Sequence, residues 1–290
     1  MSAHIPTNES SYELLDSGMG MKLERFGAFT LARPDPEALW QKHLSEDVWK
    51  AANATYERKG ATGAWKKDAT LPKAWTISYG GLSLELRPTS FKHVGLFPEQ
   101  KEHWDWMTKK LTAAHGVRPL KVLNLFAYTG AATLAAANTG AEVVHLDSSK
   151  VAIEWARKNA ELSGLAAAPI RWIEDDVLKF LRKELKRGNR YDAIIMDPPA
   201  FGHGSGSALW KIERDFYELI ELSLQILSDT PVALILNGYT AGYSSLTLKN
   251  NLIPLAAKYG GILESGELAI SEGDGTRLLP AGVFARWSAH

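Results

Sequence analysis

The feature that most constrains this chain is an alternation of short apolar runs and longer amphipathic segments from Lys121 onward. Runs such as "KVLNLF", "EVVHLD" and "YDAIIMD" are each followed by a segment with the residue spacing of a helix. Strands that are buried on both faces of a parallel sheet read as nearly continuous apolar runs, because neither face meets water. The sequence therefore predicts an α/β domain whose parallel sheet is covered by helices on both faces.

The residues before this alternation are predicted to form a smaller, β-rich domain. Residues 12–33 contain two apolar stretches around Gly-rich turns, which is a hairpin pattern. A second hairpin is expected to turn at Gly80-Gly81. Helices are expected to begin at "PDPEALW", residues 34–40, and at Pro98. The expected division is a small α+β domain at 1–90, a linker helix at 91–120 and the larger α/β domain at 121–290.

Composition excludes several classes of function. The chain has no cysteine, which excludes disulfides, thiolate metal sites and cysteine nucleophiles. Its eight histidines show no spacing typical of a metal site, so no metal is predicted. Acidic and basic residues balance at 33 each, which disfavours a large nucleic-acid interface but not a local basic patch. With neither a signal pattern nor an apolar run long enough to span a bilayer, a cytoplasmic protein without membrane contact is expected.

Ligands of such sheets bind at the carboxyl ends of the strands, so the residues after each apolar run are candidates. The first run leads into "NLFAYTGAAT", where Gly130 would let the backbone approach a ligand closely. This loop has one glycine instead of the G-x-G-x-x-G pattern, which disfavours a dinucleotide. The alternative for Gly130 is a tight strand-to-helix turn without a ligand.

Acidic residues end the second and third apolar runs. Asp147 could accept both hydroxyls of a ribose, or it could cap the following helix, although Ser148 or Ser149 could do that instead. Asp176 could accept a hydrogen bond from an adenine amino group, or it could be the N-cap of the helix that begins at Val177. Asp175 is its neighbour and could exchange roles with it.

The fourth run ends in "DPPAF", residues 197–201, followed by a Gly/Ser/His segment. Two prolines fix the backbone, so the Asp197 carboxylate and the nearby carbonyls are expected to be held stiffly at the sheet edge. Phe201 offers a flat face to a substrate ring, and residues 202–207, including His203, could fold over it. The alternative is a proline-terminated strand with a plain surface loop.

Taken in order, "NLFAYTGAAT", Asp147, "EDDV" and "DPPAF" resemble class I S-adenosylmethionine-dependent methyltransferases. With "GLFPEQ" at residues 95–100, the chain is similar to the family that methylates 23S ribosomal RNA of the large subunit. The PUA domain that often occurs in that family is not recognised here. The resemblance implies a Rossmann-like, seven-stranded sheet whose last strand is antiparallel.

The resemblance also implies roles for single residues. The "DPPAF" residues would lie beside the sulfonium and the methyl acceptor, and the other matched positions would surround the cofactor. The catalytic candidates are Asp197, Pro198, Pro199 and Phe201. The cofactor-binding candidates are Phe97, Gln100, Asn124, Phe126, Tyr128, Thr129, Gly130, Asp147, Ser148, Asp175, Asp176 and Asp197.

The methyl acceptor is constrained by the missing thiol. Methylation at C5 of a pyrimidine normally needs a thiolate that adds at C6, so a heteroatom acceptor in RNA is expected instead. A protein or small-molecule acceptor and a catalytically silent cofactor-binding protein are the alternatives. A basic cluster at residues 182–190 either binds RNA or complements the dipole of its helix. The oligomeric state stays open, with a homodimer as one alternative.

Overall fold

The computed structural model describes residues 3–4, 11–59, 62–114, 116, 118–203, 209–239, 242–273 and 275–290. The chain forms two compact units. The C-terminal unit consists mainly of His103–Glu267 and Gly282–His290, and the N-terminal unit consists of His4–Glu102 together with Leu268–Ala281. The expected domain boundaries near residues 90 and 120 stay predictions.

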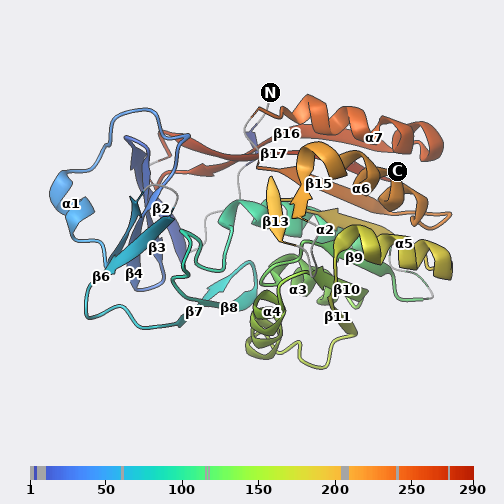
Figure 1. Cartoon of the computed structure of the whole chain (residues 1–290), viewed down its shortest axis with the longest axis horizontal. Coiled ribbons are helices and arrows are strands. Elements are labelled where there is room, and N and C mark those ends of the chain that lie inside the picture. The colour runs from blue at the N-terminus through green and yellow to red at the C-terminus, as the bar shows by residue number, and fades with distance from the viewer. Residues whose placement is uncertain are drawn as a thin grey trace. The chain divides into compact units, whose positions relative to one another are not determined.

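The C-terminal unit is built on a mostly parallel sheet (Figure 1). In spatial order its strands are β1 (Ala3–His4), β16 (Ile262–Ser271), β17 (Leu278–Ser288), β15 (Ala233–Gly238), β12 (Ala193–Met196), β9 (Lys121–Leu125), β10 (Glu142–Asp147) and β11 (Ile170–Glu174). The strands from β15 to β11 pair in parallel, whereas β17 pairs antiparallel with β15. The predicted Rossmann-like sheet of seven strands is confirmed, and the two-residue β1 is added at its edge.

Helices cover both faces of this sheet. They are α2 (Lys101–Ala113), α3 (Ala131–Ala137), α4 (Lys150–Leu162), α5 (Val177–Arg187), α6 (Ile212–Gln225) and α7 (Ser245–Tyr259). Leu123 and Leu125 of β9 point into a core shared with α5, α6 and α7, whereas Val122 points into a core shared with α2 and α3. Helix α4 lies beside α3 (Figure 1). Because successive strand residues face opposite sides, β9 has to be apolar almost throughout.

The N-terminal unit holds a five-stranded sheet and a separate hairpin. The sheet contains, in order, β2 (Tyr12–Gly18), β3 (Met21–Phe26), β4 (Phe29–Pro34), β5 (Ala54–Lys59) and β6 (Thr62–Lys67). The hairpin joins β7 (Trp75–Tyr79) to β8 (Leu82–Leu86), with the predicted turn at Gly80-Gly81. The expected β-rich character of this part is therefore confirmed.

The helix expected at residues 34–40 is wrong. This segment forms turns, and the short helix α1 (Glu46–Lys50) follows it. The carbonyls of Ala38 and Trp40 accept hydrogen bonds from Gly20 and Met19 in the turn between β2 and β3, at 2.8 and 2.7 Å. These long-range bonds use carbonyl groups that a helix would have paired internally.

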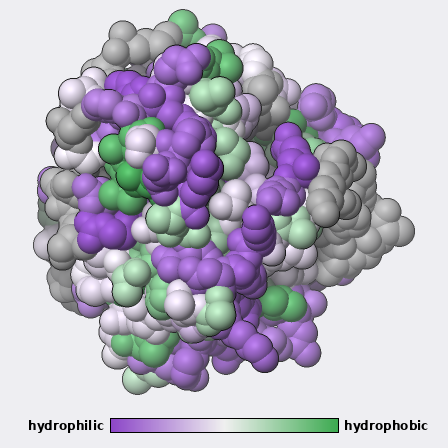
Figure 2. Space-filling model, turned by 90° about the vertical axis from the view of Figure 1, so that its left-hand side faces the viewer, coloured by the Kyte–Doolittle hydropathy of each residue, from purple (hydrophilic) through white to green (hydrophobic). Residues whose placement is uncertain are grey.

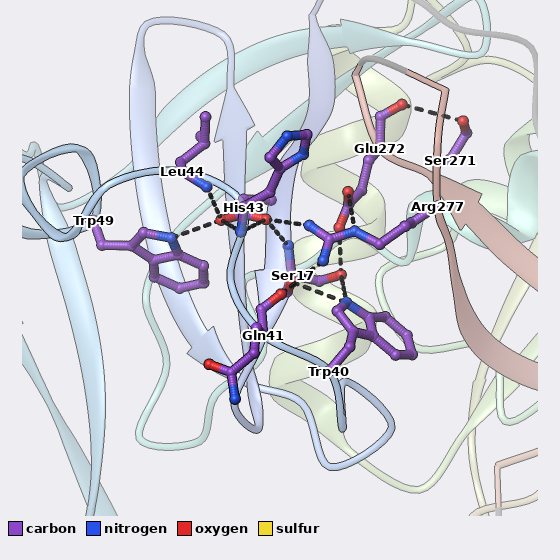
Figure 3. Close-up of polar contacts among 10 residues, drawn as sticks. Ser17, Trp40, Gln41, His43, Leu44, Trp49, Ser271, Glu272 and Arg277 are labelled. Atoms are coloured by element: carbon purple, nitrogen blue, oxygen red, sulfur yellow. Dashed lines mark hydrogen bonds and ion pairs between the residues drawn. The ribbon is translucent and has the colours of Figure 1, made fainter.

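The tip of the β16–β17 hairpin is part of the N-terminal unit. Glu272 forms a parallel bridge with Leu14 of β2, and the Gly273 amide donates to the Leu14 carbonyl at 2.9 Å. Beside this bridge, Arg277 reaches the buried Asp16 carboxylate at 2.7 Å and Glu272 at 2.8 Å (Figure 3). A segment near the end of the chain thus completes a sheet that begins at residue 12.

One surface of the molecule is shown in Figure 2. Hydrophilic side chains predominate there, and the hydrophobic ones lie in small patches between them. Within the described part of the chain, no helix is long and apolar enough to cross a membrane.

Candidate active site at the carboxyl edge of the parallel sheet

A pocket lies where β10, β11 and β12 end, all within the C-terminal unit. It is a small pocket, with a volume of about 40 Å³. Six of the predicted site residues line it: Phe126, Asp147, Ser148, Asp175, Asp176 and Pro199. Leu146, Val177, Gly202 and Trp210 complete the lining. Acidic side chains from two loops therefore meet aromatic and aliphatic ones at one edge of the sheet.

The loop between β9 and α3 has a strained backbone next to this pocket. Phe126 and Tyr128 adopt left-handed conformations with φ of 58° and 49°, which side chains other than glycine rarely do. Side chains from two other elements hold this conformation. The Tyr128 amide donates to Asp147 Oδ2 at 2.8 Å, and Asn159 Nδ2 of α4 donates to the Thr129 carbonyl at 2.9 Å. Strain of this kind persists only when the surroundings fix it, and it concentrates at functional sites.

Gly130 is required at the end of this loop for two reasons. Its φ is 87°, in the left-handed region, and a Cβ there would lie 2.8 Å from the Cβ of Ala156. The turn and the close packing of α4 thus account for this glycine. Its predicted contact with the cofactor stays a prediction.

Behind the loop, three buried polar side chains form a chain across the sheet. Asn124 Nδ2 donates to Thr133 Oγ1 at 2.9 Å, and Thr133 Oγ1 lies 2.9 Å from His145 Nδ1. A hydroxyl that accepts from Asn124 donates its own proton onward, so Nδ1 is the acceptor and Nε2 carries the proton. Burial, and next the charge of Arg157, lower the pKa of His145 to about 3, which keeps the ring neutral. Asn124 thus supports the loop from the buried side, and its predicted contact with the cofactor stays a prediction.

Asp147 ends β10 and projects to the pocket. Its oxygens accept from the backbone amides of Tyr128 and Ser149, each at 2.8 Å. Burial raises the pKa of Asp147 above its usual value, and the backbone amides partly offset that rise. The cap of α4 is Ser149, which accepts from the Ala152 amide at 3.2 Å, so Asp147 is not needed for capping. Each of its oxygens keeps a lone pair that a ligand hydroxyl can use.

The two acids after β11 have partners in the protein. Asp176 is the N-cap of α5 and accepts from the Lys179 amide at 3.0 Å, as one of its two predicted roles required. Asp175 pairs with Lys183 at 2.6 Å and lies 3.5 Å from Lys179. These interactions lower the pKa of Asp175 against the opposing effect of its partial burial. Contact of either acid with adenine stays a prediction.

The rigid segment after β12 is held by Trp210, which the sequence analysis did not single out. Its Nε1 donates to the Pro199 carbonyl at 2.7 Å, and its ring lies 5.2 Å from that of Phe126, edge to face. Trp210 is the middle residue of β14 (Leu209–Lys211), which pairs with β13 (Phe201–His203). A tryptophan in a polar stretch directly before a helix was the one available signal for this role.

Several predicted site residues do not line this pocket. Tyr128, Thr129 and Gly130 lie in its supporting loop, while Asp197 and Pro198 precede the residue that lines it. Phe201 is 73% exposed, so its ring is open to a substrate and is not packed into the fold. Phe97 and Gln100 belong to the N-terminal unit. The expected closing loop lies mostly outside the described residues, as does the side chain of His203.

Comparison with known proteins shows the family to which this chain belongs. The family model of the S-adenosylmethionine-dependent methyltransferases matches residues 50–239, more than half of the chain. The chain belongs to this methyltransferase family. S-adenosylmethionine is therefore its cofactor, and the predicted class of enzyme is confirmed.

Relatives of this methyltransferase are similar over part of their length. A ribosomal RNA large subunit methyltransferase I of Aeromonas salmonicida is 32% identical over 56% of this chain and 39% of its own. A ribosomal RNA large subunit methyltransferase K/L of Shewanella frigidimarina is 31% identical over 67% of this chain and 28% of its own. The methyltransferase thus spans less than half of these relatives. A solved methyltransferase structure from Agrobacterium tumefaciens is 38% identical, covers all of this chain and 94% of its own, and has a TM-score of 0.94.

The residues of the pocket fit the adenosine part of the cofactor. Leu146, Val177 and Trp210 offer apolar surface for a purine, and Asp147 offers carboxylate oxygens for ribose hydroxyls. No cation among the described residues pairs with Asp147, which leaves its charge directed at the pocket. Within the described residues, no cluster of three or more histidine or acidic side chains is arranged to hold a metal.

Proposed function

We propose that this methyltransferase modifies a heteroatom of an RNA base, with the exocyclic amine of a purine as the favoured acceptor. The proposal draws its substrate class from the relatives, whose names are those of ribosomal RNA methyltransferases. Such a substrate would place the enzyme in the cytoplasm. The observation that carries the choice of acceptor is the arrangement of carbonyl groups after β12.

The three carbonyls after Asp197 differ in their partners. The Pro199 carbonyl accepts from Trp210 Nε1 at 2.7 Å, and the Ala200 carbonyl accepts from the Ile212 amide at 3.0 Å. The Pro198 carbonyl accepts no hydrogen bond from any described residue. An amine with two N–H groups could therefore donate to the Asp197 carboxylate and to the Pro198 carbonyl.

Two acceptors on one amine have a chemical consequence. Both N–H bonds would be directed into the protein, so the nitrogen lone pair would face away from them toward the methyl donor. When bound, S-adenosylmethionine supplies an electrophilic methyl group. Holding nucleophile and electrophile in line is the main catalytic contribution open to the protein, with effective molarities that can reach about 10⁵ M. The rigid Pro198-Pro199 pair and Trp210 would keep this alignment.

The chain offers no thiol for the other main route. A pyrimidine C5 becomes nucleophilic only after a nucleophile adds at C6, and cysteine is absent from all 290 residues. A purine amine needs no such addition because its nitrogen lone pair reacts directly. The amine proposal is thus the one that the available side chains can serve.

Transfer of radiolabelled methyl from S-adenosylmethionine tests this proposal. RNA and protein from cells that lack the gene are the two acceptor pools, since their sites are unmodified. We expect label in RNA, found after digestion in a single nucleoside methylated on a purine nitrogen. A 5-methylcytosine product would contradict the heteroatom assignment. Label in protein alone, or in neither pool, would contradict the RNA assignment.

Two variants connect such an activity to the site. Asp197→Ala should remove most turnover while leaving the affinity for S-adenosylhomocysteine within a few-fold of the wild type. Asp229→Ala is the matched control, because Asp229 is an exposed acid outside the pocket. Full turnover in Asp197→Ala would show that its carboxylate does not orient the acceptor.

A further inference from the structure

A second cavity lies at the opposite edge of the same sheet, where the parallel strands begin. Its volume is about 350 Å³, within the range of small-molecule sites, which starts at about 300 Å³. Lys121, Glu142 and Ile170, the first residues of β9, β10 and β11, line it together with residues 189–191. The methyl-transfer site has no use for this cavity, because its own residues follow the last residues of the strands.

The floor of this amino-edge pocket is apolar. Val143, Val144 and the Tyr191 ring lie there, each no more than 6% exposed. One wall, residues 189–191, is rigid because buried Glu184 fixes it. Glu184 accepts from Asn189 Nδ2 and from the Tyr191 hydroxyl, both at 2.7 Å. The cavity therefore does not depend on exposed, freely rotating side chains for its shape.

The rim of the pocket is cationic. Lys121, Arg171 and Arg190 surround it, and Glu142 is the one acid among the lining residues. None of the three cations forms a side-chain ion pair within the described part of the chain. Glu142, by contrast, interacts with the charge of Arg118. This excess of positive charge stands out in a chain whose formal net charge is zero.

Most cations of the basic cluster expected around the end of α5 differ from those of the pocket rim because they form ion pairs. Arg182 pairs with Glu218 at 2.5 Å, Lys183 with Asp175 at 2.6 Å and Arg187 with Glu184 at 2.9 Å. These three cations are compensated within the protein. Arg190 donates only to a backbone carbonyl, that of Asn189. Within the described part of the chain, Lys121 and Arg190 thus have no acidic partner, whereas Arg171 interacts with the charge of Glu184 without forming an ion pair.

We propose that the amino-edge pocket binds a nucleotide, with its phosphate held by Arg171 and Arg190 and its organic part on the apolar floor. A guanidinium donates two parallel N–H bonds to phosphate, which makes arginine the usual residue for such recognition. With Glu142 offset by Arg118, the three cations of the rim favour an anionic phosphate group, whether a monoester or the diester of an RNA chain. The nucleotide is either free or part of an RNA chain, and the two sources share this chemistry.

Titration with nucleoside monophosphates tests the pocket. The four monophosphates and their parent nucleosides are titrated against the full chain by calorimetry, with S-adenosylhomocysteine saturating the cofactor pocket. Binding of a monophosphate that is about tenfold tighter than that of its nucleoside is expected if the rim contacts phosphate. Equal binding of nucleoside and monophosphate would overturn the proposal.

Variants assign such binding to the rim. Arg171→Ala/Arg190→Ala should weaken monophosphate binding by about tenfold or more, because both phosphate ligands are lost. Lys109→Ala is the matched control, since Lys109 is an exposed cation of the same unit that does not line the pocket. Thermal unfolding and S-adenosylhomocysteine affinity should be unchanged in both variants. An equal loss in the control would show general charge attraction and overturn the assignment.

An RNA oligomer separates the two sources. If no monophosphate binds but the double variant lowers RNA affinity and Lys109→Ala does not, the ligand is a nucleotide within RNA. If monophosphates bind and RNA affinity is unchanged in the double variant, the ligand is a free nucleotide. No monophosphate binding together with unchanged RNA affinity overturns the proposal. Methyl transfer is measured separately, so a wrong acceptor assignment would not be confused with a wrong pocket.

Discussion

Two carboxylates of this protein are enclosed in different ways. Asp16 of the N-terminal unit accepts from the backbone amides of His43 and Leu44, from the Trp49 indole and from Arg277 (Figure 3). Asp147 of the C-terminal unit accepts from backbone amides, and no cation lies beside it in the part of the chain that the structure describes. A fully compensated carboxylate has little to offer a ligand and serves stability, whereas Asp147 keeps its charge for one.

A third carboxylate extends the comparison. Glu99 is buried beside Glu24, Lys22 and Arg33, but Arg33 makes its close ion pair with Glu24, at 2.6 Å. Burial, with a further contribution from Glu24, raises the pKa of Glu99 to about 7 against the opposing effect of Lys22 and Arg33. The negative charge of Glu99 is therefore the least compensated of the three.

The largest effect is expected from Arg277→Ala. Removing this guanidinium leaves Asp16 and Glu272, which are both buried, without their cation. Loss of one partner of a buried ion pair typically costs about 3–5 kcal/mol of unfolding free energy. Denaturant unfolding measures this loss. Arg25→Ala is the control, since Arg25 pairs with Glu13 at the surface and should cost less than about 1 kcal/mol. Equal losses of unfolding free energy in the two variants would show that the buried ion pair of Asp16 contributes no more than a surface ion pair.

Glu99→Gln should have the next largest effect, and it depends on pH. The folded protein holds the Glu99 proton more tightly than the unfolded chain does, because the pKa is about 7 instead of 4.5. This contribution to stability is complete below about pH 4.5 and is lost as the pH rises through about 7. The difference in unfolding free energy, variant minus wild type, should therefore be about 3 kcal/mol larger at pH 8 than at pH 4. A difference that is constant with pH would contradict the raised pKa.

Asp147→Ala tests the carboxylate that is left for a ligand. Loss of two hydrogen bonds to ribose should weaken S-adenosylhomocysteine binding by about 1–3 kcal/mol in calorimetry. Since the pKa of Asp147 is raised, wild-type affinity should also fall as the pH drops through that pKa and the carboxylate becomes neutral. The variant should lack this pH dependence. Unchanged affinity in a folded variant would show that ribose binds elsewhere.

The smallest effect is expected from substitutions of Asp176. Two variants distinguish its role as the N-cap of α5 from its predicted contact with the cofactor. Asp176→Ala should cost about 1 kcal/mol of stability because α5 loses its N-cap. Asp176→Ser keeps a capping oxygen but shortens the side chain, so stability should be retained. If Asp176 also contacts adenine, both variants should weaken cofactor binding. Normal binding in both would leave the cap as its only function.

The sequence predicted the sheet well because the signal is local. The apolar runs at β9, β10, β12 and β15 mark buried strands, whereas β11 lies at the edge of the sheet and is only partly buried. An acid that ends or follows a run arrives at the carboxyl edge. Asp147, Asp175, Asp176 and Pro199 were found in the pocket for this reason. Their roles toward the cofactor and acceptor stay predictions.

Long-range contacts account for what the sequence did not indicate. Trp210 lies nine residues past Phe201, and only the pairing of β13 with β14 brings it to Pro199. Residues 34–40 have helix-like composition, yet their carbonyls pair with the turn at Met19 and Gly20. Asn124 and His145 become neighbours through strand register, which no local pattern specifies.

The ion pair between Arg277 and Asp16 joins residues that are 261 positions apart. During synthesis, β2 emerges from the ribosome with its acid long before the guanidinium that neutralises it. The sheet that starts the chain therefore stays incomplete, with a buried charge unmatched, until almost the whole C-terminal unit has been translated. Both units therefore need the end of the chain, because the C-terminal unit is completed only by Gly282–His290, which follow Arg277.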